Sequence, residues 1–299
     1  MIVYRNKFNL KCTKKSILVI GNFDGLHLGH ISIVKEAIKL AKNNKQRAGL
    51  LTFDPNPKEF FTKNNKFKII SNLEKEKILS EMKLNYMIVL KFNKSLRNLS
   101  AENFIKKILI NKINPHQVII GKEFKFGKNR TGNSTLLKNY FEVKIANQKK
   151  IGGNKISSTE IRKLIEKGKV SDIKKLLGRN WSVTSKVIDG DKIGRKLGFR
   201  TANMIIENRI QPLRGVYATK LHFEGNTFEG ISNFGIAPTF GIKKNNVLET
   251  HLFSPVKNLY KKNIKVEFIK FLRKEKKFKS KKNLTDQIVK DIKSAKKVF

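Results

Sequence analysis

Cysteine and long apolar runs are both scarce in this sequence. Cys12 is the only cysteine among 299 residues, so no internal disulfide can form and nothing indicates an oxidising compartment. No stretch approaches the roughly 18 consecutive apolar residues that a membrane helix needs, and the N-terminus has no long apolar segment before a cleavage site. We therefore expect a cytoplasmic protein that has no membrane partner.

Acidic residues are few as well. Asp+Glu number 23 against 65 Lys+Arg, which gives a formal net charge of +42. Such a charge suggests a polyanionic partner. The basic residues are spread along nearly the whole chain, however, and accompany an excess of Asn, Ile and Phe, as drift toward A- and T-rich codons would produce. We therefore expect no specific nucleic-acid partner. The competing hypothesis, an inactive protein that binds nucleic acid, predicts salt-sensitive binding without turnover.

The length and the 39% hydrophobic content favour two domains with substantial cores. From Ser16 to about Leu177, strand-like apolar runs alternate with helical periodicity, which predicts an α/β domain with a parallel sheet and helices on both faces. The predicted strands are "SILVIG", "RAGLLTF", "NYMIVLKF" and "HQVIIG". One helix is predicted from the apolar stripe Ile31, Val34, Ile38 and Ala41. A second helix is expected at "SAENFIKKILI", with Ser100 as its cap.

The pattern changes after "LLGRNWSV", where Gly178 is placed to end a short helix. We expect two domains, 1–178 and 179–299. In the second, "GVYATKLHF", "TFEGISNF" and "NIKVEFIKF" alternate with the period of two that strands have, and "EGNT" suits a hairpin turn. Several short strands without intervening helices predict an antiparallel barrel or sandwich. A closing helix is predicted from the apolar stripe Leu284, Ile288, Ile292, Ala295 and Phe299.

The segment "VIGNFDGLHLGHISIV" joins a strand to a helix through a glycine-rich turn that carries two histidines. Free backbone N–H groups and the positive end of the helix dipole favour an anion there. Three glycines, Gly21, Gly25 and Gly29, let the backbone come close without Cβ clashes. His27 and His30 can both donate hydrogen bonds to phosphate oxygens and stabilise the charge that develops in an in-line displacement.

A metal site and a place in the core each account less well for the paired histidines. A zinc site needs further Cys or His ligands, and the chain has only five histidines and one cysteine. Two ordinary core histidines within a glycine turn fit the pattern less well still.

The segment "GNFDGLHLGH" resembles the HxGH signature of the nucleotidyltransferase superfamily, in the GNFDGxHxGH form typical of bacterial bifunctional riboflavin kinase/FMN adenylyltransferases, also called FAD synthetases. Three later segments are similar to motifs of that family and stand in its order: "TFDPNP" to TFxPHP, "GKEFKFG" to GxDFxFG, and "ISSTEIR" to ISSTxIR. The resemblance implies a Rossmann-like domain that adenylylates FMN to FAD and releases pyrophosphate.

The resemblance also implies which residues contact ATP. It assigns catalysis to His27, His30 and Arg162, and ATP binding to Gly21, Asn22, Phe23, Asp24, Gly25, Gly29, Ser158 and Thr159. Ser157 followed by Glu160 is a capping-box pattern that starts a helix; capping alone is the alternative role of Ser157. Arg162 then lies in the first turn, where a guanidinium suits the β- and γ-phosphates.

By the same resemblance, the flavin lies between the segments "FDPNP" and "EFKFG". The implied contacts are Asn56, Pro57, Glu123, Phe124 and Phe126. For the two phenylalanines, a place in the hydrophobic core is an equally good interpretation. Asn56 stands where the family usually has histidine, and Glu123 where it has aspartate. Both residues stay polar, so we expect altered affinity rather than loss of binding.

The segment "GDKIGRKLGFRTANM" resembles the riboflavin kinase signature GxxxGRxLGFPTANL. The later segments "GVYAT", "SNFGIAPTFG", "LETHLF", "NLY" and "LRKEKKF" follow that family's order, so the resemblance covers nearly the entire chain. It implies an antiparallel β-barrel with a C-terminal helix, which phosphorylates riboflavin to FMN with ATP.

The implied kinase site has three parts. The glycine-rich loop would hold ATP through Gly190, Gly194, Arg195 and Gly198. Thr201 and Asn203 would bind Mg²⁺ together with ATP phosphates and water. Glu249 would accept a proton from the ribityl hydroxyl as it attacks the γ-phosphate; the alternative for Glu249 is a surface acid on an edge strand.

Four positions depart from the kinase pattern: Arg200 replaces proline, Ala237 a frequent arginine, Ser185 a glycine, and Lys261 the glycine after "LY". Because the set of Thr201, Asn203 and Glu249 is retained, we expect an active kinase. The alternative is an FAD-forming enzyme with a weakened or inactive kinase domain. A different phosphate acceptor for the first domain is disfavoured by the kinase-like second half. We expect a monomer that uses riboflavin, FMN and ATP with Mg²⁺.

Overall fold

The computed structural model describes residues 1–6, 16–64, 66–147, 149–189, 198–237, 245–256 and 258–299. By its internal contacts the chain divides into two compact units, 1–158 and 159–299. The boundary after residue 178 that the sequence suggested for the two functional domains stays a prediction.

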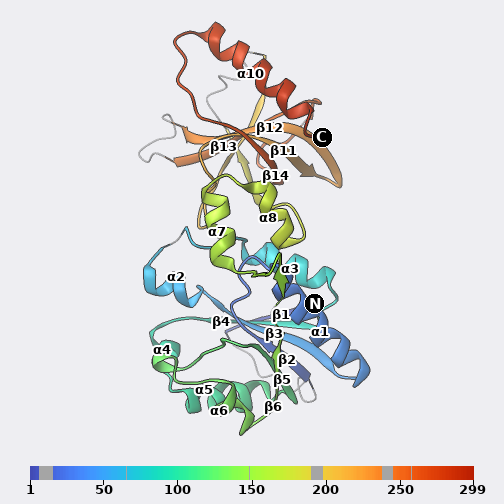
Figure 1. Cartoon of the computed structure of the whole chain (residues 1–299), viewed down its shortest axis with the longest axis vertical. Helices are drawn as coiled ribbons and strands as arrows, with labels where there is room; N and C mark the ends of the chain where they lie inside the picture. Colours follow the sequence, from blue (N-terminus) through green and yellow to red (C-terminus); the bar gives the residue numbers. More distant parts are fainter. Residues whose placement is uncertain (7–15, 65, 148, 190–197, 238–244, 257) are drawn as a thin grey trace. The chain divides into compact units, whose positions relative to one another are not determined.

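The first unit is built on a sheet of six parallel strands (Figure 1). Their order is β1-β4-β3-β2-β5-β6, with bounds Ile2–Arg5 (β1), Ser16–Ile20 (β2), Arg47–Asp54 (β3), Tyr86–Lys91 (β4), Gln117–Gly121 (β5) and Glu142–Ala146 (β6). The four predicted strands are the central four. The two edge strands, β1 and β6, were not predicted, because they are only partly buried and their apolar pattern is weak.

Helices cover both faces of this sheet, as predicted. Figure 1 shows α3 on one side and α5 and α6 on the other. The helical segments of this unit are α1 (Leu28–Asn43), α2 (Pro57–Thr62), α3 (Asn72–Glu81), α4 (Lys94–Arg97), α5 (Ala101–Phe104), the π-helix η2 (Ile105–Ile113), the 3₁₀-helix η3 (Lys128–Arg130) and α6 (Ser134–Lys138). Ser100 caps α5 as predicted, because its Oγ accepts a hydrogen bond from the Asn103 backbone N–H at 3.1 Å.

All five residues of β2 are buried, which explains the continuous apolar run in the sequence. Leu18 and Ile20 belong to the core cluster that includes Phe104 and Leu109 from the helices on one face. Because β2 and β3 are adjacent and parallel, the segments that follow them leave the same edge of the sheet. These two segments contain the "GNFDG" and "FDPNP" motifs.

The first unit also contains a small hairpin of β7 (Lys150–Ile151) and β8 (Asn154–Lys155). The second unit begins with α7 (Ser158–Glu166), whose first residue still belongs to the first unit, and α8 (Val170–Leu177). Gly178 ends α8 in the left-handed conformation, as predicted.

Six antiparallel strands of the second unit close into a barrel, so the barrel rather than the sandwich is the correct alternative. Around the barrel the order is β10-β13-β12-β11-β14-β9, with bounds Ser182–Ile188 (β9), Thr201–Ile205 (β10), Gly215–Phe223 (β11), Asn226–Ala237 (β12), Asn245–Leu252 (β13) and Asn263–Lys274 (β14). The predicted hairpin turn joins β11 to β12 through Glu224 and Gly225.

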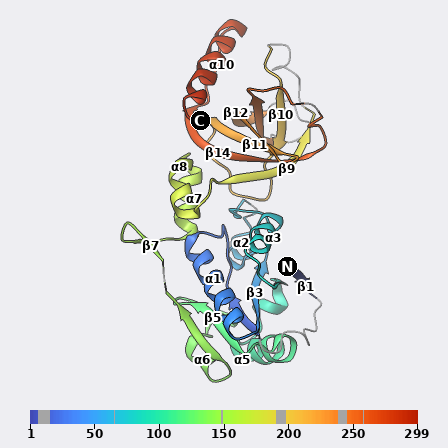
Figure 2. The same cartoon turned by 90° about the vertical axis from the view of Figure 1, so that its right-hand side faces the viewer.

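The C-terminal helix α10 (Lys281–Lys296) lies beside the barrel, as Figure 2 shows. Ile288, Ile292 and the fully buried Ala295 pack in one cluster with Val216 and Ile231 of the barrel. Three residues of the predicted stripe therefore form the contact face, whereas Leu284 is outside this cluster and Phe299 follows the end of the helix. The described helices include none with the length and apolarity that a membrane crossing requires.

Lys261 has a φ of +62°, the left-handed conformation that glycine adopts at little cost. This residue stands where the kinase pattern has glycine, so a lysine occupies a conformation that favours glycine. We expect Lys261→Gly to raise the free energy of unfolding by about 0.5–1 kcal/mol, measured by urea denaturation. The matched control is Lys262→Gly. Lys262 has no positive φ, so its replacement is expected to destabilise; a stabilisation of equal size in both variants would contradict the prediction.

Candidate functional site

The turn between β2 and α1 holds an unusual run of backbone conformations. Phe23 and Leu26, neither of them glycine, have φ values of +48° and +43°. Such conformations cost about 1–3 kcal/mol each and cluster at functional sites. Phe23 and Leu26 are buried at 3% and 0% exposure, so packing in the core maintains the turn in this form.

His27 is the N-cap of α1. Its Nδ1 accepts a hydrogen bond from the backbone N–H of His30 at 3.2 Å, so in the neutral ring the proton is on Nε2. The two imidazole rings stack with centroids 3.6 Å apart and planes at 17°. Gly29 favours this arrangement, because a Cβ there would lie 3.1 Å from Nδ1 of His27, closer than ordinary contact, and would displace the ring.

His30 is the more perturbed of the two histidines. Burial lowers its pKa well below the usual value, and the nearby His27 and Lys75 lower it further. Its Nδ1 is buried without a hydrogen-bond partner among the described residues, and its ring lies 5.0 Å from that of Phe23. The site therefore presents two stacked imidazoles at a helix N-terminus, where an anion is favoured, and burial disfavours the charged form of His30.

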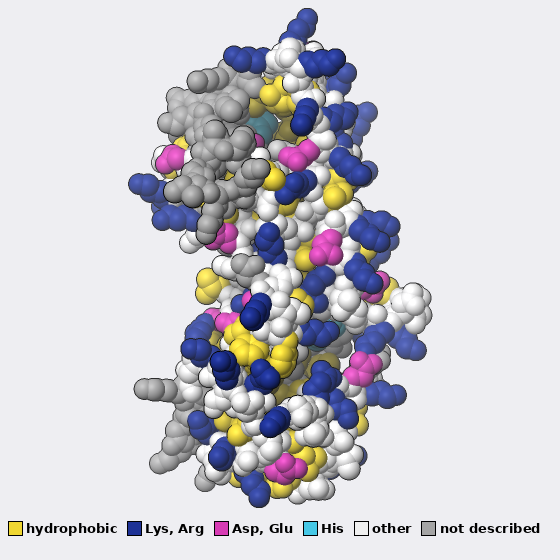
Figure 3. All heavy atoms as spheres, turned by 90° about the vertical axis from the view of Figure 1, so that its left-hand side faces the viewer, with side chains coloured by type: hydrophobic (Ala, Val, Ile, Leu, Met, Phe, Trp, Pro, Cys, Tyr) yellow, Lys and Arg dark blue, Asp and Glu magenta, His cyan; other side chains and the backbone are white. Residues whose placement is uncertain are grey.

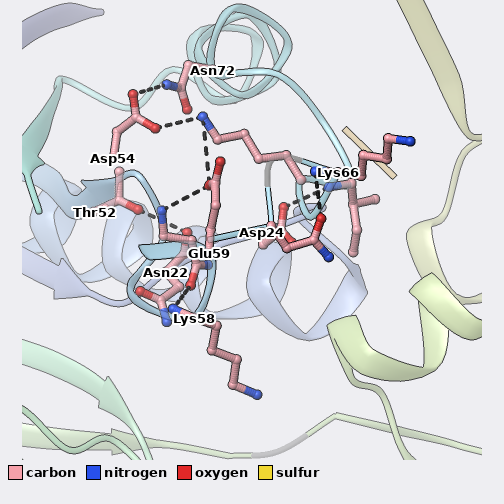
Figure 4. A network of polar contacts seen from close by, with 12 residues as sticks. Asn22, Asp24, Thr52, Asp54, Lys58, Glu59, Lys66 and Asn72 are labelled. Carbon is pink, nitrogen blue, oxygen red and sulfur yellow. Dashed lines mark hydrogen bonds and ion pairs between the residues drawn. The ribbon is translucent and has the colours of Figure 1, made fainter. Parts of the chain in front are cut away.

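Two distant motifs meet at this turn. Ser158 of the "ISSTEIR" segment donates a hydrogen bond from Oγ to the backbone carbonyl of Asp24 at 2.9 Å, although 134 residues separate them. Thr52 of β3 donates from Oγ1 to the carbonyl of Asn22 at 2.9 Å. Figure 4 shows Asn22, Asp24 and Thr52 within one network of polar contacts. The structure thus brings together three segments that the sequence assigned to one nucleotide site.

Lys75 is a further member of this network that sequence reasoning missed. Its Nζ donates to the same Asn22 carbonyl at 3.3 Å. Nothing in the sequence singles it out, because it is one of many lysines on a polar helix.

The "FDPNP" segment starts a helix. Asn56 caps α2 by accepting from the Lys58 backbone N–H at 3.0 Å, and Pro57 is the first helical residue. Glu59 completes a capping box with the Asn56 backbone N–H at 3.3 Å, and burial is the main cause that raises the pKa of this carboxyl group. Asparagine is among the best N-cap residues. This local role explains why asparagine can stand where the family usually has histidine. Flavin contact by Asn56 and Pro57 stays a prediction.

An ion-pair cluster lies beside this capping box. Lys68 Nζ contacts Asp54 Oδ1 at 2.7 Å and Glu59 Oε2 at 4.0 Å. The other carboxylate oxygen of Asp54 accepts from Asn72 at 2.9 Å. Figure 4 shows Asp54, Glu59 and Asn72 gathered around this contact. The cluster joins the end of β3 to the start of α3.

In the "EFKFG" segment the two phenylalanines differ. Phe126 is 7% exposed and belongs to the core cluster, with its ring 5.5 Å from Phe104. Phe124 is only partly buried and stacks on Phe126 at 5.6 Å. The exposed Glu123 pairs with Lys155 at 2.7 Å. A place in the core therefore describes Phe126 well, whereas Phe124 keeps an accessible face for a ligand.

Thr159 and Arg162 follow Ser158 on α7, and both belong to the second unit. Arg162 is the fifth residue of the helix, so it lies just beyond the first turn in which the sequence placed it. Helix α7 begins at Ser158, so Thr159 lies in its first turn. The N-terminus of a helix favours phosphate.

In the barrel, strand register brings the predicted kinase residues together. Asn203 of β10 lies directly opposite Glu249 of β13, and Thr201 lies opposite His251. Directly opposite residues of antiparallel strands project from the same face. On its other side Glu249 pairs with Asn233 of β12. The result is a row of three polar residues, Asn203, Glu249 and Asn233, in which Asn233 was not predicted because only the register reveals it.

Asn203 is only 6% exposed, and its Oδ1 is buried without a hydrogen-bond partner among the residues that the structure describes. A buried amide oxygen without a partner lowers the stability of the fold unless a cation or a hydrogen-bond donor binds to it. Of the glycine-rich loop, Gly190, Gly194 and Arg195 lie outside the described residues. Gly198 has a φ of +87°, which suits glycine.

Three of the departures from the kinase pattern are accommodated locally, besides Lys261. The carbonyl of Arg200 accepts a hydrogen bond from Nδ1 of His251 at 2.9 Å. Ser185 donates from Oγ to the carbonyl of Ile205 at 3.1 Å. Ala237 ends β12 opposite Asn245. The backbone around these positions is therefore that of a regular barrel.

Comparison with known proteins identifies the same two parts. A model of the FAD synthetase family matches residues 9–160, and a riboflavin kinase model matches residues 177–299. The bifunctional riboflavin kinase/FMN adenylyltransferase of Buchnera aphidicola subsp. Schizaphis graminum is 42% identical, over 100% of this chain and 99% of that protein. The protein of the same name from Haemophilus influenzae is 35% identical, with 94% of each chain covered. A crystal structure described as a macrolide-efflux protein from Streptococcus pneumoniae has a TM-score of 0.87 and 26% identity over the whole of both chains.

Fold and site together thus define a nucleotidyltransferase-like unit followed by a riboflavin kinase-like barrel. The chain belongs to the family of bifunctional riboflavin kinase/FMN adenylyltransferases. The family and the fold class predicted from the sequence are confirmed.

Proposed function

We propose that this enzyme carries out both activities of its family, with one in each part of the chain. The barrel part phosphorylates riboflavin to FMN with ATP, and the N-terminal part joins FMN to the adenylyl group of a second ATP and releases pyrophosphate. The observation that carries the second step is the hydrogen bond between Ser158 and Asp24, because it unites the two phosphate motifs at a paired-histidine turn.

In adenylyl transfer, a phosphate oxygen of FMN attacks the α-phosphorus of ATP. A new P–O bond forms as the bond to pyrophosphate breaks, so the enzyme needs no covalent intermediate. His27 and His30 lie where they can donate to the oxygens that gain charge, next to the electropositive end of α1. Ser158, Thr159 and Arg162 are assigned to the β- and γ-phosphates, which leave as pyrophosphate.

The glycine turn around these histidines is assigned to ATP, through Gly21, Asn22, Phe23, Asp24, Gly25 and Gly29. The flavin end of FMN is assigned to Asn56, Pro57, Glu123, Phe124 and Phe126. The accessible face of Phe124 supports a stacking role, whereas Phe126 supports the site from within the core.

In the kinase reaction, Glu249 is the general base. It accepts the proton of the ribityl hydroxyl as that oxygen attacks the γ-phosphorus and ADP leaves. ATP is assigned to the loop with Gly190, Gly194, Arg195 and Gly198. Positioning and charge neutralisation provide most of the rate enhancement in such a reaction.

Thr201 and Asn203 fit Mg²⁺, since the buried Oδ1 of Asn203 needs a partner and neutral oxygens suit this ion when phosphates supply the charge. When bound, the ion neutralises and orients the phosphates of ATP. Among the described residues, no three His, Cys, Asp or Glu side chains group as a metal site.

The alternative of a weakened kinase is not favoured. Its basis was the set of departures at Arg200, Ala237, Ser185 and Lys261, and the described ones retain a regular backbone. The relatives that match over the full length carry both activities in their names.

We further propose a cytoplasmic monomer with no specific nucleic-acid or membrane partner. Figure 3 supports this view, because Lys and Arg side chains are scattered over the visible face instead of being gathered in one patch. A nucleic-acid surface is expected to concentrate basic residues on one face.

The direct test is incubation of the full chain with riboflavin, ATP and Mg²⁺, with FMN and FAD separated over time. We expect FMN to form first and FAD to follow. Formation of neither product would overturn the proposal, and FAD from added FMN without any FMN from riboflavin would restore the weakened-kinase alternative.

Arg162→Ala is expected to damage adenylyl transfer selectively. Loss of a guanidinium from the leaving pyrophosphate should lower kcat/KM for ATP in FAD formation about 10- to 100-fold. Lys163→Ala, the next residue on α7, is the matched control and should change the rate little. An unchanged rate of FAD formation in the Arg162 variant would contradict the assigned role.

A further inference from the structure

Helix α3 and the segment before it support the glycine turn from behind. Lys75 is 5% exposed, and its Nζ reaches the Asn22 carbonyl at 3.3 Å. Thr52 donates to the same carbonyl at 2.9 Å. The backbone N–H of Ile69 donates to Oδ1 of Asp24 at 3.0 Å. The turn is therefore held at two polar positions, Asn22 and Asp24.

Lys75 is a buried cation whose charge is incompletely compensated. Its only hydrogen-bond partner among the described residues is a neutral carbonyl, and no carboxylate there forms an ion pair with it. The charged groups that act on it at longer range are Asp24, Asp54 and Glu76, which attract it, and Lys68, which repels it. Burial outweighs them and lowers the pKa of Lys75. An ammonium group in this condition would be stabilised by an anion bound at the turn.

The charge of Lys75 also acts on His30. The pKa of His30 is lowered first by burial, then by His27 stacked at 3.6 Å, and then by Lys75. These are the charged or titratable groups that affect His30 from α1 and α3. Lys75 thus acts on both Asn22, through a hydrogen bond, and His30, through its charge.

We propose that Lys75 is a positioning residue for adenylyl transfer: its buried ammonium group holds the Asn22 carbonyl and adds fixed positive charge to the phosphate site beside His30. This inference rests on the proposed placement of adenylyl transfer at the paired histidines. Lys75 touches the turn and not the reacting atoms, so it acts through Asn22 and His30.

Three substitutions in the full chain separate charge from packing. Lys75→Met keeps the length and removes the charge, Lys75→Gln keeps a hydrogen-bond donor without charge, and Lys75→Arg keeps the charge. We expect the Met and Gln variants to lower kcat/KM for ATP in FAD formation about 10- to 100-fold, the range for residues that orient a site from outside. The Arg variant should retain more activity than the Gln variant. The matched control is Lys77→Met, which removes an exposed charge from the same helix.

The kinase reaction of the same molecule is the internal measure of folding. We expect FMN formation from riboflavin to stay within about twofold of the parent in all four variants. The thermal midpoint of Lys75→Met should be equal or higher, because an apolar side chain replaces a buried charge. If Lys75→Met lowers the thermal midpoint or loses kinase activity, we treat this variant as misfolded, and the comparison of Lys75→Gln with Lys75→Arg then decides.

The pKa of His30, measured by NMR titration, distinguishes the two roles of Lys75. A purely structural role of Lys75 would leave this pKa unchanged. Because a neighbouring positive charge disfavours the protonated ring, its removal should raise the pKa of His30 by about half a unit or more in Lys75→Met and Lys75→Gln. Lys77→Met should leave this pKa unchanged. If Lys75→Gln formed FAD at the wild-type rate and left the pKa of His30 unchanged, the inference would be wrong. A neutral hydrogen-bond donor would then be enough for the function of this position.

The two proposals fail in different ways. If His30→Ala leaves FAD formation intact, the placement of the reaction is wrong whatever Lys75 does. If His30→Ala is inactive while the Met and Gln variants keep both the parent rate and the parent His30 pKa, only the role of Lys75 is wrong.

Discussion

Replacing His30 by alanine is expected to slow FAD formation from FMN about 100- to 1000-fold, the usual cost of removing one donor to a developing charge. His30 is a better target than His27, because His27 also caps α1 through Nδ1 and its loss would cost about 1 kcal/mol of stability. The measurement is steady-state formation of FAD from added FMN and ATP. FMN formation from riboflavin should be unchanged, since the kinase site lies in the other part of the chain.

The matched control for His30 is His116→Ala. His116 belongs to the same unit, but its side chain is 55% exposed and its nearest acid is Glu142 at 3.8 Å. This variant should keep both activities. Equal rates of FAD formation in the two variants would show that the paired histidines are not the adenylyl-transfer site.

Replacing Glu249 by glutamine should slow FMN formation about 100- to 10,000-fold, the range for loss of a general base. Glutamine keeps the size and polarity of the side chain but cannot accept the proton of the ribityl hydroxyl. Riboflavin phosphorylation is followed by separation of FMN, and FAD formation from added FMN serves as the folding control. That second rate should not change.

Glu229→Gln is the matched control for Glu249. Glu229 lies on β12 of the same barrel, with a 46% exposed side chain that pairs with Lys220 at 3.6 Å. An exposed pair of this kind contributes little, so both activities should be retained. If Glu249→Gln formed FMN as fast as Glu229→Gln, Glu249 would not be the general base of the kinase reaction.

Local patterns predicted much of this fold. The buried run of β2, the cap at Ser100, the end of α8 at Gly178 and the turn at "EGNT" all depend on residues within a few positions of each other. The two edge strands were missed, and the segment of η2 was predicted as a helix without its π geometry. Edge strands carry a weak apolar pattern, and the spacing of apolar residues does not distinguish a π-helix from an α-helix.

The candidate site shows the same division. Motifs in the order of the two families named His27, Arg162 and Glu249, yet none indicated that His27 caps a helix or that Asn56 caps another. Asn233 and Lys75 were absent from the prediction altogether. Asn233 joins Glu249 only through the register of β12 with β13, and Lys75 reaches Asn22 only because α3 packs behind the turn.

The sequence by itself determined the order of the elements, the family and the chemical type of each site, because periodicity, caps and motifs are properties of neighbouring residues. Only the tertiary structure decided the order of the strands around the barrel, that Ser158 meets Asp24, and that a lysine lies buried beside the paired histidines. Those features depend on pairing and packing between segments far apart in the chain. Their distances follow from sheet order and register, which no local pattern specifies.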